Sequence, residues 1–342
     1  NARGAIVREY AKRGWTFSLA DYRDRYAQYK TDKDLQSAHA AFPWIVTWDD
    51  HEVENNYAGL VDELGDTGPR FQDPVQFARQ RAAAYQAYYE HMPLRRRIVP
   101  GSPNYRLYRR FDFGDLLRIN VLDTRQNRTD QPPGFFADFG PVQSGLDNVN
   151  GTLTGDEQEA WLRRGLARSH ARWNVIAQQV MMSQLRFPNL LDPTHPLPPI
   201  ANLDQWDGYD PARARLLRFL HDARVPNPVV LAGDIHSAWF SDLRINRDDL
   251  GSPPVAVEFT ATSVSSDFPV GFDAPLKAFN PTLNPHVRYF DGLLRGYLRI
   301  DVRRHRMITD ARTVDSIAVR ESPVRTATSW AVRAGQPGLV PA

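Results

Sequence analysis

The chain of 342 residues contains no cysteine. This absence excludes a disulfide framework and any thiolate ligand for a metal ion within the chain. It is equally compatible with a secreted and with a cytosolic protein. No apolar run approaches the roughly 18–20 residues that a membrane-spanning helix needs. The net charge is only +2, which argues against a nucleic-acid binder and against a strongly basic membrane binder.

Several catalytic motifs are also missing. The sequence has no glycine-rich phosphate loop and no GxSxG elbow. The stretch "HEVEN" resembles the start of a zinc peptidase motif, but Asn55 stands where the second histidine is required. With only nine histidines in the chain, each one near a carboxylate is worth locating.

The composition is that of a globular protein, with 42% hydrophobic and 24% charged residues. Apolar strand patterns alternate with helical patterns, which predicts an α/β fold, and the strand-rich last third favours a mixed sheet. The helices are expected over residues 18–30, 73–92, 154–170 and 210–223. The strands are expected over 43–48, within 107–125, and over 173–180, 227–239, 254–263, 287–304 and 306–314.

Helix-capping residues support three of these helices. Asp73 can cap the second helix, with Pro74 at its first position. Thr154 and Glu157 have the spacing of a capping box. Asp210 is the expected cap of the last helix. Two loops rich in proline, residues 130–153 and 187–202, are long enough to be lids or insertions.

Three apolar segments end in side chains that can bind a metal or an anion. We call these ends the first motif (Asp49-Asp50-His51), the second motif (Asp123-Thr124-Arg125) and the third motif (Asp234-Ile235-His236). In an open α/β sheet the site lies outside the carboxyl ends of the strands, so parallel strands would bring the three motifs to one edge.

Aspartate and histidine together suit a hard or borderline metal cation. Arg125 adds a bidentate donor suited to phosphate or carboxylate. A metal, an arginine and a neighbouring histidine are what phosphoryl chemistry needs. A single Asp-His pair after a strand is more often a cap or a turn, and Asp-Thr-Arg alone is more often a surface ion pair. The occurrence of three such ends in one chain favours a metal site.

These residues resemble a known family. "WDDHEVENN" (48–56), "LDTRQNR" (122–128), "GDIHSAW" (233–239) and the lead-in "DLQSAHAAFP" (34–43) are similar to the alkaline phosphatase D family, the PhoD-like branch of the calcineurin-type metallophosphoesterases. The resemblance extends from about Ser18 to about Asp310. It implies an α/β sandwich of two mixed β-sheets flanked by helices, with a metal centre at the strand ends.

The resemblance also implies roles for individual residues. Its metal ligands are Asp50, Asn55, Asp234 and His236. Asn55 is alternatively a phosphate donor, and Asp49 and Asp50 can exchange roles. His51 would assist the leaving oxygen or stabilise the transition state, and Arg125 would bind the phosphate.

The expected function is metal-dependent hydrolysis of phosphate esters, with a metal-activated oxygen attacking phosphorus. The alternatives are a phosphodiesterase or phospholipase D of the same family, and a non-catalytic metal- or phosphate-binding relative. The resemblance implies calcium and iron as cofactors, a small-molecule or lipid phosphate ester as substrate, and a secreted, periplasmic or cell-wall location. No nucleic-acid partner is indicated.

The family also carries an upstream strand ending in Gly-Asp and a segment containing cysteine, and nothing in this chain matches them. We therefore expect a catalytic domain over residues 1–333 that is incomplete at its N-terminus and lacks the N-terminal strands. Residues 334–342, which contain glycine and proline, are expected to form a flexible tail.

Overall fold

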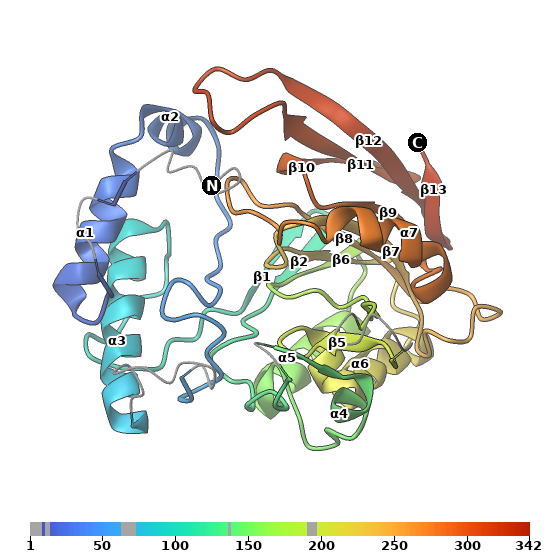
Figure 1. Cartoon of the computed structure of the whole chain (residues 1–342), viewed down its shortest axis with the longest axis horizontal. Helices are drawn as coiled ribbons and strands as arrows, with labels where there is room; N and C mark the ends of the chain where they lie inside the picture. The colour runs from blue at the N-terminus through green and yellow to red at the C-terminus, as the bar shows by residue number, and fades with distance from the viewer. Residues whose placement is uncertain (1–8, 11–13, 63–72, 136–137, 190–196) are drawn as a thin grey trace.

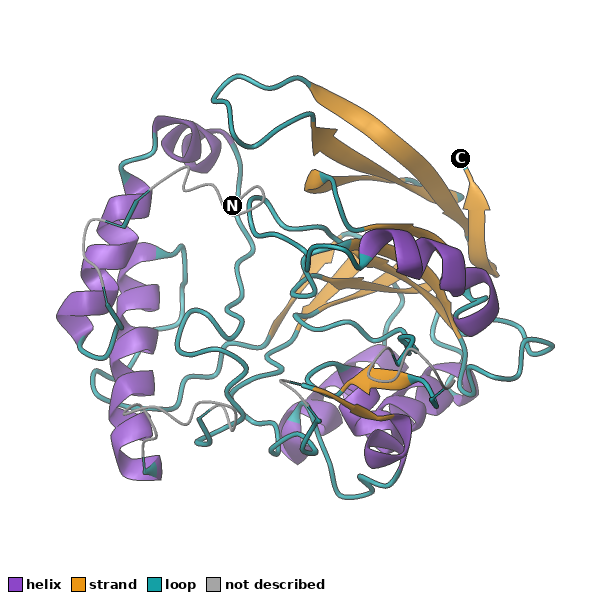
Figure 2. Cartoon of the chain, in the orientation of Figure 1, coloured by secondary structure: helices purple, strands orange, loops and turns teal. Residues whose placement is uncertain are grey.

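The computed structural model describes residues 9–10, 14–62, 73–135, 138–189 and 197–342. Within these ranges the chain folds into an α/β sandwich, as expected (Figure 1, Figure 2). Its helices are α1 (Leu19–Lys30), α2 (Lys33–Ala41), α3 (Pro74–His91), α4 (Val142–Leu146), α5 (Gly155–Ala167), the 3-10 helix η2 (Trp206–Tyr209), α6 (Asp210–Asp222) and α7 (Asp273–Leu283). None of the helices in the described ranges combines the length and the apolar character that crossing a bilayer requires.

The main sheet has seven strands, in the order β1-β2-β4-β6-β8-β7-β9. They are β1 (Arg109–Phe113), β2 (Leu117–Val121), β4 (Trp173–Ala177), β6 (Pro228–Ala232), β8 (Ala256–Thr260), β7 (Ala238–Leu243) and β9 (Val287–Asp291). Strands β2, β4, β6 and β8 run parallel to one another, and β1, β7 and β9 pair antiparallel. The carboxyl ends of β2, β4 and β6 therefore meet at one edge of the sheet.

Both faces of this sheet are covered, which explains the continuous apolar runs in its parallel strands. Successive strand residues point to opposite faces. Ile176 and Val230 pack with leucines of α5 and α6, whereas their neighbours Val175 and Val229 pack against the second sheet. Figure 1 shows the second sheet lying over the main one, on the side opposite α5 and α6.

The second sheet consists of β10 (Arg295–Val302), β11 (Arg306–Val314), β12 (Val324–Arg333) and β13 (Gln336–Pro341). All of its pairings are antiparallel, so only the main sheet is mixed and the expectation of two mixed sheets is corrected. The expected flexible tail is corrected as well, because most of it forms β13. Leu339 is buried between the two sheets, and this burial holds the end of the chain in place. A short pair, β3 (Phe139–Pro141) and β5 (Ile200–Asn202), lies apart from both sheets.

The helices of the N-terminal third form a group of their own beside the main sheet (Figure 2). Ser18 caps α1 in a capping box with Asp21, and Asp73 caps α3 with Pro74 at the first turn, which confirms the expected starts. Aromatic side chains join the group to the first motif: the ring of Trp48 stacks on Tyr85 of α3 with centroids 3.9 Å apart.

Two of the expected caps are wrong. The backbone N–H groups of Thr154 and Gly155 donate to the hydroxyl of Thr152, so Thr152 satisfies the start of α5. Asp210 already lies inside a helix because η2 leads directly into α6. Its carboxylate instead pairs with Arg213, at 3.0 Å.

The expected strand over residues 43–48 is extended but belongs to no sheet within the described residues. Its carbonyl groups accept hydrogen bonds from side chains instead of a neighbouring strand. Arg109 donates to the carbonyl of Val46, and Gln179 donates to that of Trp48 at 2.7 Å. Of the second proline-rich loop, residues 190–196 lie outside the described residues, as do residues 136–137 of the first.

A buried histidine links α7 and β9 to the loop after β4. The Nε2 of His286 lies 3.1 Å from the hydroxyl of Ser183, and its carbonyl accepts from the N–H of Asp242. Burial, with added repulsion from Arg247, lowers the pKa of His286 to about 3. The folded protein therefore holds this imidazole neutral.

This burial makes stability depend on pH. Below the ordinary histidine pKa of about 6.5, His286 binds a proton in the unfolded chain but stays neutral in the folded chain. Stability should therefore fall as pH drops from about 6.5 toward 3, by roughly 1.4 kcal/mol per pH unit from this group. Urea unfolding at several pH values should show a flatter profile for His286→Gln. The exposed His221→Gln serves as control, and an equal flattening in both variants would contradict the assignment.

Candidate metal centre

Two of the three motifs begin within two residues of a strand end. The second motif follows β2 and the third follows β6, and β4 lies between these strands in the sheet. The first motif follows the extended segment 43–48, and the hydroxyl of Thr47 donates to the carbonyl of Leu122 at 3.1 Å. The parallel order of the strands thus brings together residues that lie far apart in the sequence.

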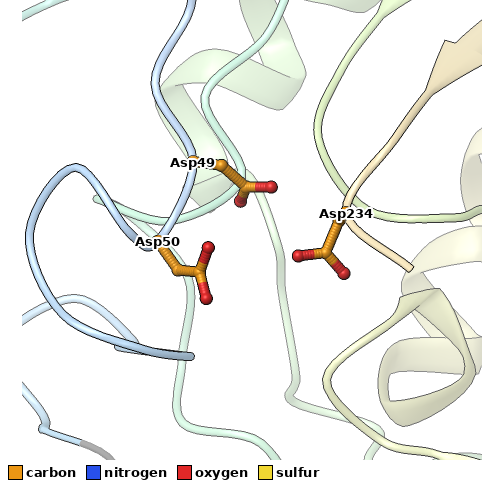
Figure 3. A group of neighbouring side chains, drawn as sticks. All are labelled: Asp49, Asp50 and Asp234. Atoms are coloured by element: carbon orange, nitrogen blue, oxygen red, sulfur yellow. The ribbon is translucent and has the colours of Figure 1, made fainter. Parts of the chain in front are cut away.

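Three carboxylates converge where the motifs meet. Asp49, Asp50 and Asp234 each offer an oxygen, and these atoms all lie within 4.8 Å of one another. Figure 3 shows the three side chains pointing into a common space from two separate segments. Such a set of carboxylate oxygens fits a hard or borderline cation, since oxygen ligands are what these ions prefer.

The carboxylate of Asp50 is oriented by its own turn. Its Oδ1 accepts from the N–H of His51 at 2.8 Å, and its Oδ2 from the N–H of Asn56 at 2.9 Å. The side chain of Asp50 is only 5% exposed, whereas that of His51 is 69% exposed, with its Nε2 3.7 Å from Asp50. One residue of this pair therefore faces the cluster and the other faces solvent.

Asp49 belongs to the cluster as well, a possibility that sequence reasoning left open. Its N–H donates to Glu52 at 2.7 Å, and its carboxylate pairs with Arg125 at 2.6 Å. The expected contact of Asn55 with metal or phosphate stays a prediction. Its N–H donates to the side chain of Glu54, and it is the next residue, Asn56, that bonds to Asp50.

Arg125 connects the cluster from the inside. Its guanidinium is fully buried and donates to Asp49 through Nε at 2.6 Å and to Asp234 through Nη2 at 2.9 Å. Nη1 donates to Asp204 at 2.7 Å. Complete burial and three carboxylate partners favour a role for Arg125 beside the carboxylates over the expected contact with phosphate. It pairs with the carboxylates and neutralises part of their charge.

Asp204 is a member of this network that sequence reasoning missed. Burial by itself would raise the pKa of Asp204, but the charges of Arg125 and Arg128 outweigh burial and lower it. Arg128 lies 2.6 Å from the same carboxylate oxygen as Arg125. Asp204 follows the second proline-rich loop in "ANLDQW", where no strand pattern or histidine marks it.

The third motif has an unusual backbone. Asp234 and His236 have φ angles of +65° and +57°, in the left-handed region that side chains other than glycine seldom adopt. Gln205 donates to the second oxygen of Asp234, while Arg125 donates to the first. Burial raises the pKa of Asp234, and the nearby carboxylate of Asp49 raises it further. Hydrogen-bonding partners thus hold the turn in a conformation that costs free energy.

His236 is oriented by a loop from another part of the chain. Its Nδ1 lies 3.1 Å from the carbonyl of Asp267, and a carbonyl can only accept, so Nδ1 carries the hydrogen. Burial and the proximity of His51 lower the pKa of His236. The neutral ring then presents the lone pair of Nε2, which is the form that binds metals.

Asp123, the aspartate of the second motif, has a structural role. Asp123 is fully buried, and its Oδ1 accepts from the N–H groups of Arg125 and Gln126 at 3.1 and 2.9 Å. This turn directs the backbone after β2 so that Arg125 enters the cluster.

An α/β sandwich with buried carboxylates and an oriented imidazole at its strand ends is a metallophosphatase-type structure. The chain belongs to the PhoD-like phosphatase family, whose sequence model matches residues 1–311. It is 41% identical over 325 residues to alkaline phosphatase D of Bacillus subtilis (strain 168). This alignment covers 94% of the present chain and 53% of the Bacillus protein.

A solved structure described as that of PhoD matches this chain with a TM-score of 0.84 and 39% identity. The match covers 99% of this chain and 62% of the other. The chain thus spans about half the length of the curated relative that it matches. The family model, the Bacillus relative and the solved structure all agree with the family resemblance of the sequence motifs.

Replacing Arg125 by methionine tests its role in the cluster. Three carboxylates then lose a shared partner, so we expect the free energy of unfolding in chelator to fall by about 3–5 kcal/mol. Calcium in place of chelator should restore part of this loss because it supplies the missing positive charge. Urea denaturation of both proteins under both conditions measures the difference.

Arg213→Met is the matched control. Arg213 is also buried and pairs with Asp210, and it donates to the carbonyl of Arg244 at 3.1 Å. Its loss should destabilise the protein without recovery in calcium. Equal recovery of the two variants in calcium would show that Arg125 does not neutralise carboxylates that a cation could also bind.

Proposed function

We propose that this protein hydrolyses phosphate esters with the help of bound metal ions. The observation that carries the proposal is the convergence of Asp49, Asp50 and Asp234, beside an oriented His236 and an exposed His51. Membership of the PhoD-like phosphatase family supports it. Phosphatase activity is named for the Bacillus relative, and we propose it for this protein as well.

Metal binding and charge compensation are assigned to different residues of the chain. Asp49, Asp50, Asp234 and His236 would hold the cation through three carboxylates and one imidazole. When bound, the cation polarises the phosphoryl oxygens and lowers the pKa of coordinated water. Arg125 touches the carboxylates and not the substrate. Its positive charge offsets part of their mutual repulsion, so that they stay close together.

His51 is the group placed to handle the leaving oxygen. Its ring is exposed beside Asp50, with Nε2 3.7 Å from that carboxylate. From that position it can donate a proton to the oxygen as the bond to phosphorus breaks. Asn55 remains a candidate for a further contact to metal or phosphate.

The finer assignments rest on the family resemblance. We propose calcium and iron as the cofactors, and a secreted or cell-wall-associated location. The substrate is a small-molecule phosphate monoester, and the alternatives are a diester or a lipid phosphate ester and a non-catalytic metal-binding relative.

The first experiment compares the hydrolysis of p-nitrophenyl phosphate and bis-p-nitrophenyl phosphate at alkaline pH, with calcium and then with chelator. Chelator-sensitive release of nitrophenol from the monoester is the expected result. Faster release from the diester would favour a phosphodiesterase. Metal binding without turnover of either ester would favour the non-catalytic alternative.

Asp234→Asn tests the cluster directly. The substitution keeps the size of the side chain and removes its charge, so we expect kcat/KM to fall at least about a hundredfold, as for other groups that stabilise charge in a transition state. Circular dichroism should report an unchanged fold. The control is Asp310→Asn in β11, whose carboxylate bonds Ser329 and Arg299 in the second sheet. Full activity of Asp234→Asn would remove this residue from the mechanism.

His51→Ala tests proton donation. Loss of a general acid should lower kcat by about 10²–10⁴ for an alkyl phosphate. The loss should be smaller for p-nitrophenyl phosphate, because nitrophenolate leaves readily without a proton. His39→Ala is the control, since the ring of His39 stacks on Trp44 with centroids 4.2 Å apart. An equal loss on both substrates would argue that His51 does not protonate the leaving group.

A further inference from the structure

A single residue after β4, Gln179, forms hydrogen bonds with the second motif and with the residues directly before each of the three motifs. Gln179 is only 4% exposed and lies two residues beyond the last residue of β4. Its Nε2 donates to the hydroxyl of Thr47 at 2.8 Å and to the carbonyl of Trp48 at 2.7 Å. These bonds hold the segment that leads into Asp49 and Asp50.

The same side chain holds the second motif. Nε2 also lies 3.0 Å from the carbonyl of Leu122, directly before Asp123. Oε1 accepts from the N–H of Thr124 at 3.1 Å and from its hydroxyl at 2.8 Å. The main-chain carbonyl of Gln179 accepts from the N–H of Gly233 at 2.8 Å, directly before Asp234.

The chemistry of the neighbours determines the orientation of this amide. The N–H of Thr124 can only donate, so it must face Oε1. The carbonyls of Trp48 and Leu122 can only accept, so they must face Nε2. A hydrocarbon in this place would remove the partner of the Thr124 N–H and of the Trp48 carbonyl, and would leave the Leu122 carbonyl with the hydroxyl of Thr47 alone. A carboxylate would place a negative charge against the two carbonyls.

The need for such a residue follows from the fold. Segment 43–48 pairs with no strand in the described part of the chain, so no ladder sets its distance from β2. Gln179 replaces that ladder with side-chain bonds. Because β4 lies between β2 and β6, its end is the position from which one residue reaches the approaches to all three motifs.

We propose that Gln179 is a positioning residue for the metal centre. Its amide sets the separation between the first and second motifs, and its main-chain carbonyl fixes the third. Through these bonds it holds Asp49 and Asp50 at the distance from Asp234 that a cation needs. The link to metal binding rests on the proposed function, whereas the positioning of the segments does not.

The experiment compares Gln179→Leu with Gln178→Leu by hydrogen–deuterium exchange of the metal-free proteins. Gln178 is a matched control, since it is also buried, lies next in sequence, and bonds instead to the carbonyl of Val180 and the indole N–H of Trp206. In Gln179→Leu, exchange should rise at least about tenfold in peptides covering residues 45–52 and 122–126, because one strong hydrogen-bond partner is lost at each.

Peptides covering residues 233–236 provide an internal comparison. Their bond is to the main chain of Gln179, which the substitution retains, so their exchange should rise less. A uniform rise over the whole protein, or the same pattern in Gln178→Leu, would overturn the proposal. Thr47→Val is a milder second variant, which removes the bonds of this hydroxyl to Gln179 and to the carbonyl of Leu122. It should loosen residues 45–52 and 122–126 less than Gln179→Leu does, and it keeps the test valid if Gln179→Leu folds poorly.

Calcium titration, followed by the shift in melting temperature, then tests the link to the metal. The Kd of Gln179→Leu should be about 10–100-fold weaker than that of the unaltered protein, as for other residues that orient metal ligands, while Gln178→Leu should be unchanged. If the unaltered protein binds no calcium, the proposed function fails, and the exchange data still decide whether Gln179 positions the segments.

Discussion

The structure of the site depends on charge compensation around one buried guanidinium. Asp49, Asp204 and Asp234 come from distant parts of the chain, and each would be costly to bury as a lone anion. Arg125 gives all of them a partner. The result is a set of carboxylates that stay close together yet keep oxygens directed away from the arginine. Removal of one partner from such a network is costly because the other charges remain buried.

Much of the architecture could be predicted from periodicity. Alternating helices and apolar strands indicate the parallel part of the main sheet, and the helix starts expected near residues 18 and 73 are real boundaries. The failures have physical causes. Residues 43–48 have a strand composition but receive their hydrogen bonds from side chains. The glycine and proline content of the last residues favours a flexible end, but the burial of Leu339 outweighs it.

The site was only partly predictable for a related reason. The aspartates of the first and third motifs stand out because histidines follow them after apolar runs. Asp204 and Gln179 have no such mark. Asp204 lies in a loop, and Gln179 is one of two adjacent glutamines whose roles differ only through three-dimensional contacts. The position of Arg125 after β2 can be read from the sequence, but whether its guanidinium meets a phosphate or three carboxylates depends on its burial.

The pairings of Arg125 also have a consequence for how the protein folds. It bonds to residues 76 and 109 positions away in the sequence, and parallel strands cannot form such contacts until the intervening chain has been ordered. The network is therefore completed late, after β2, β4 and β6 have docked. Until then its carboxylates are hydrated and repel one another only weakly. Newly made chains should accordingly bring the three carboxylates of the cluster together only at the last step of their folding.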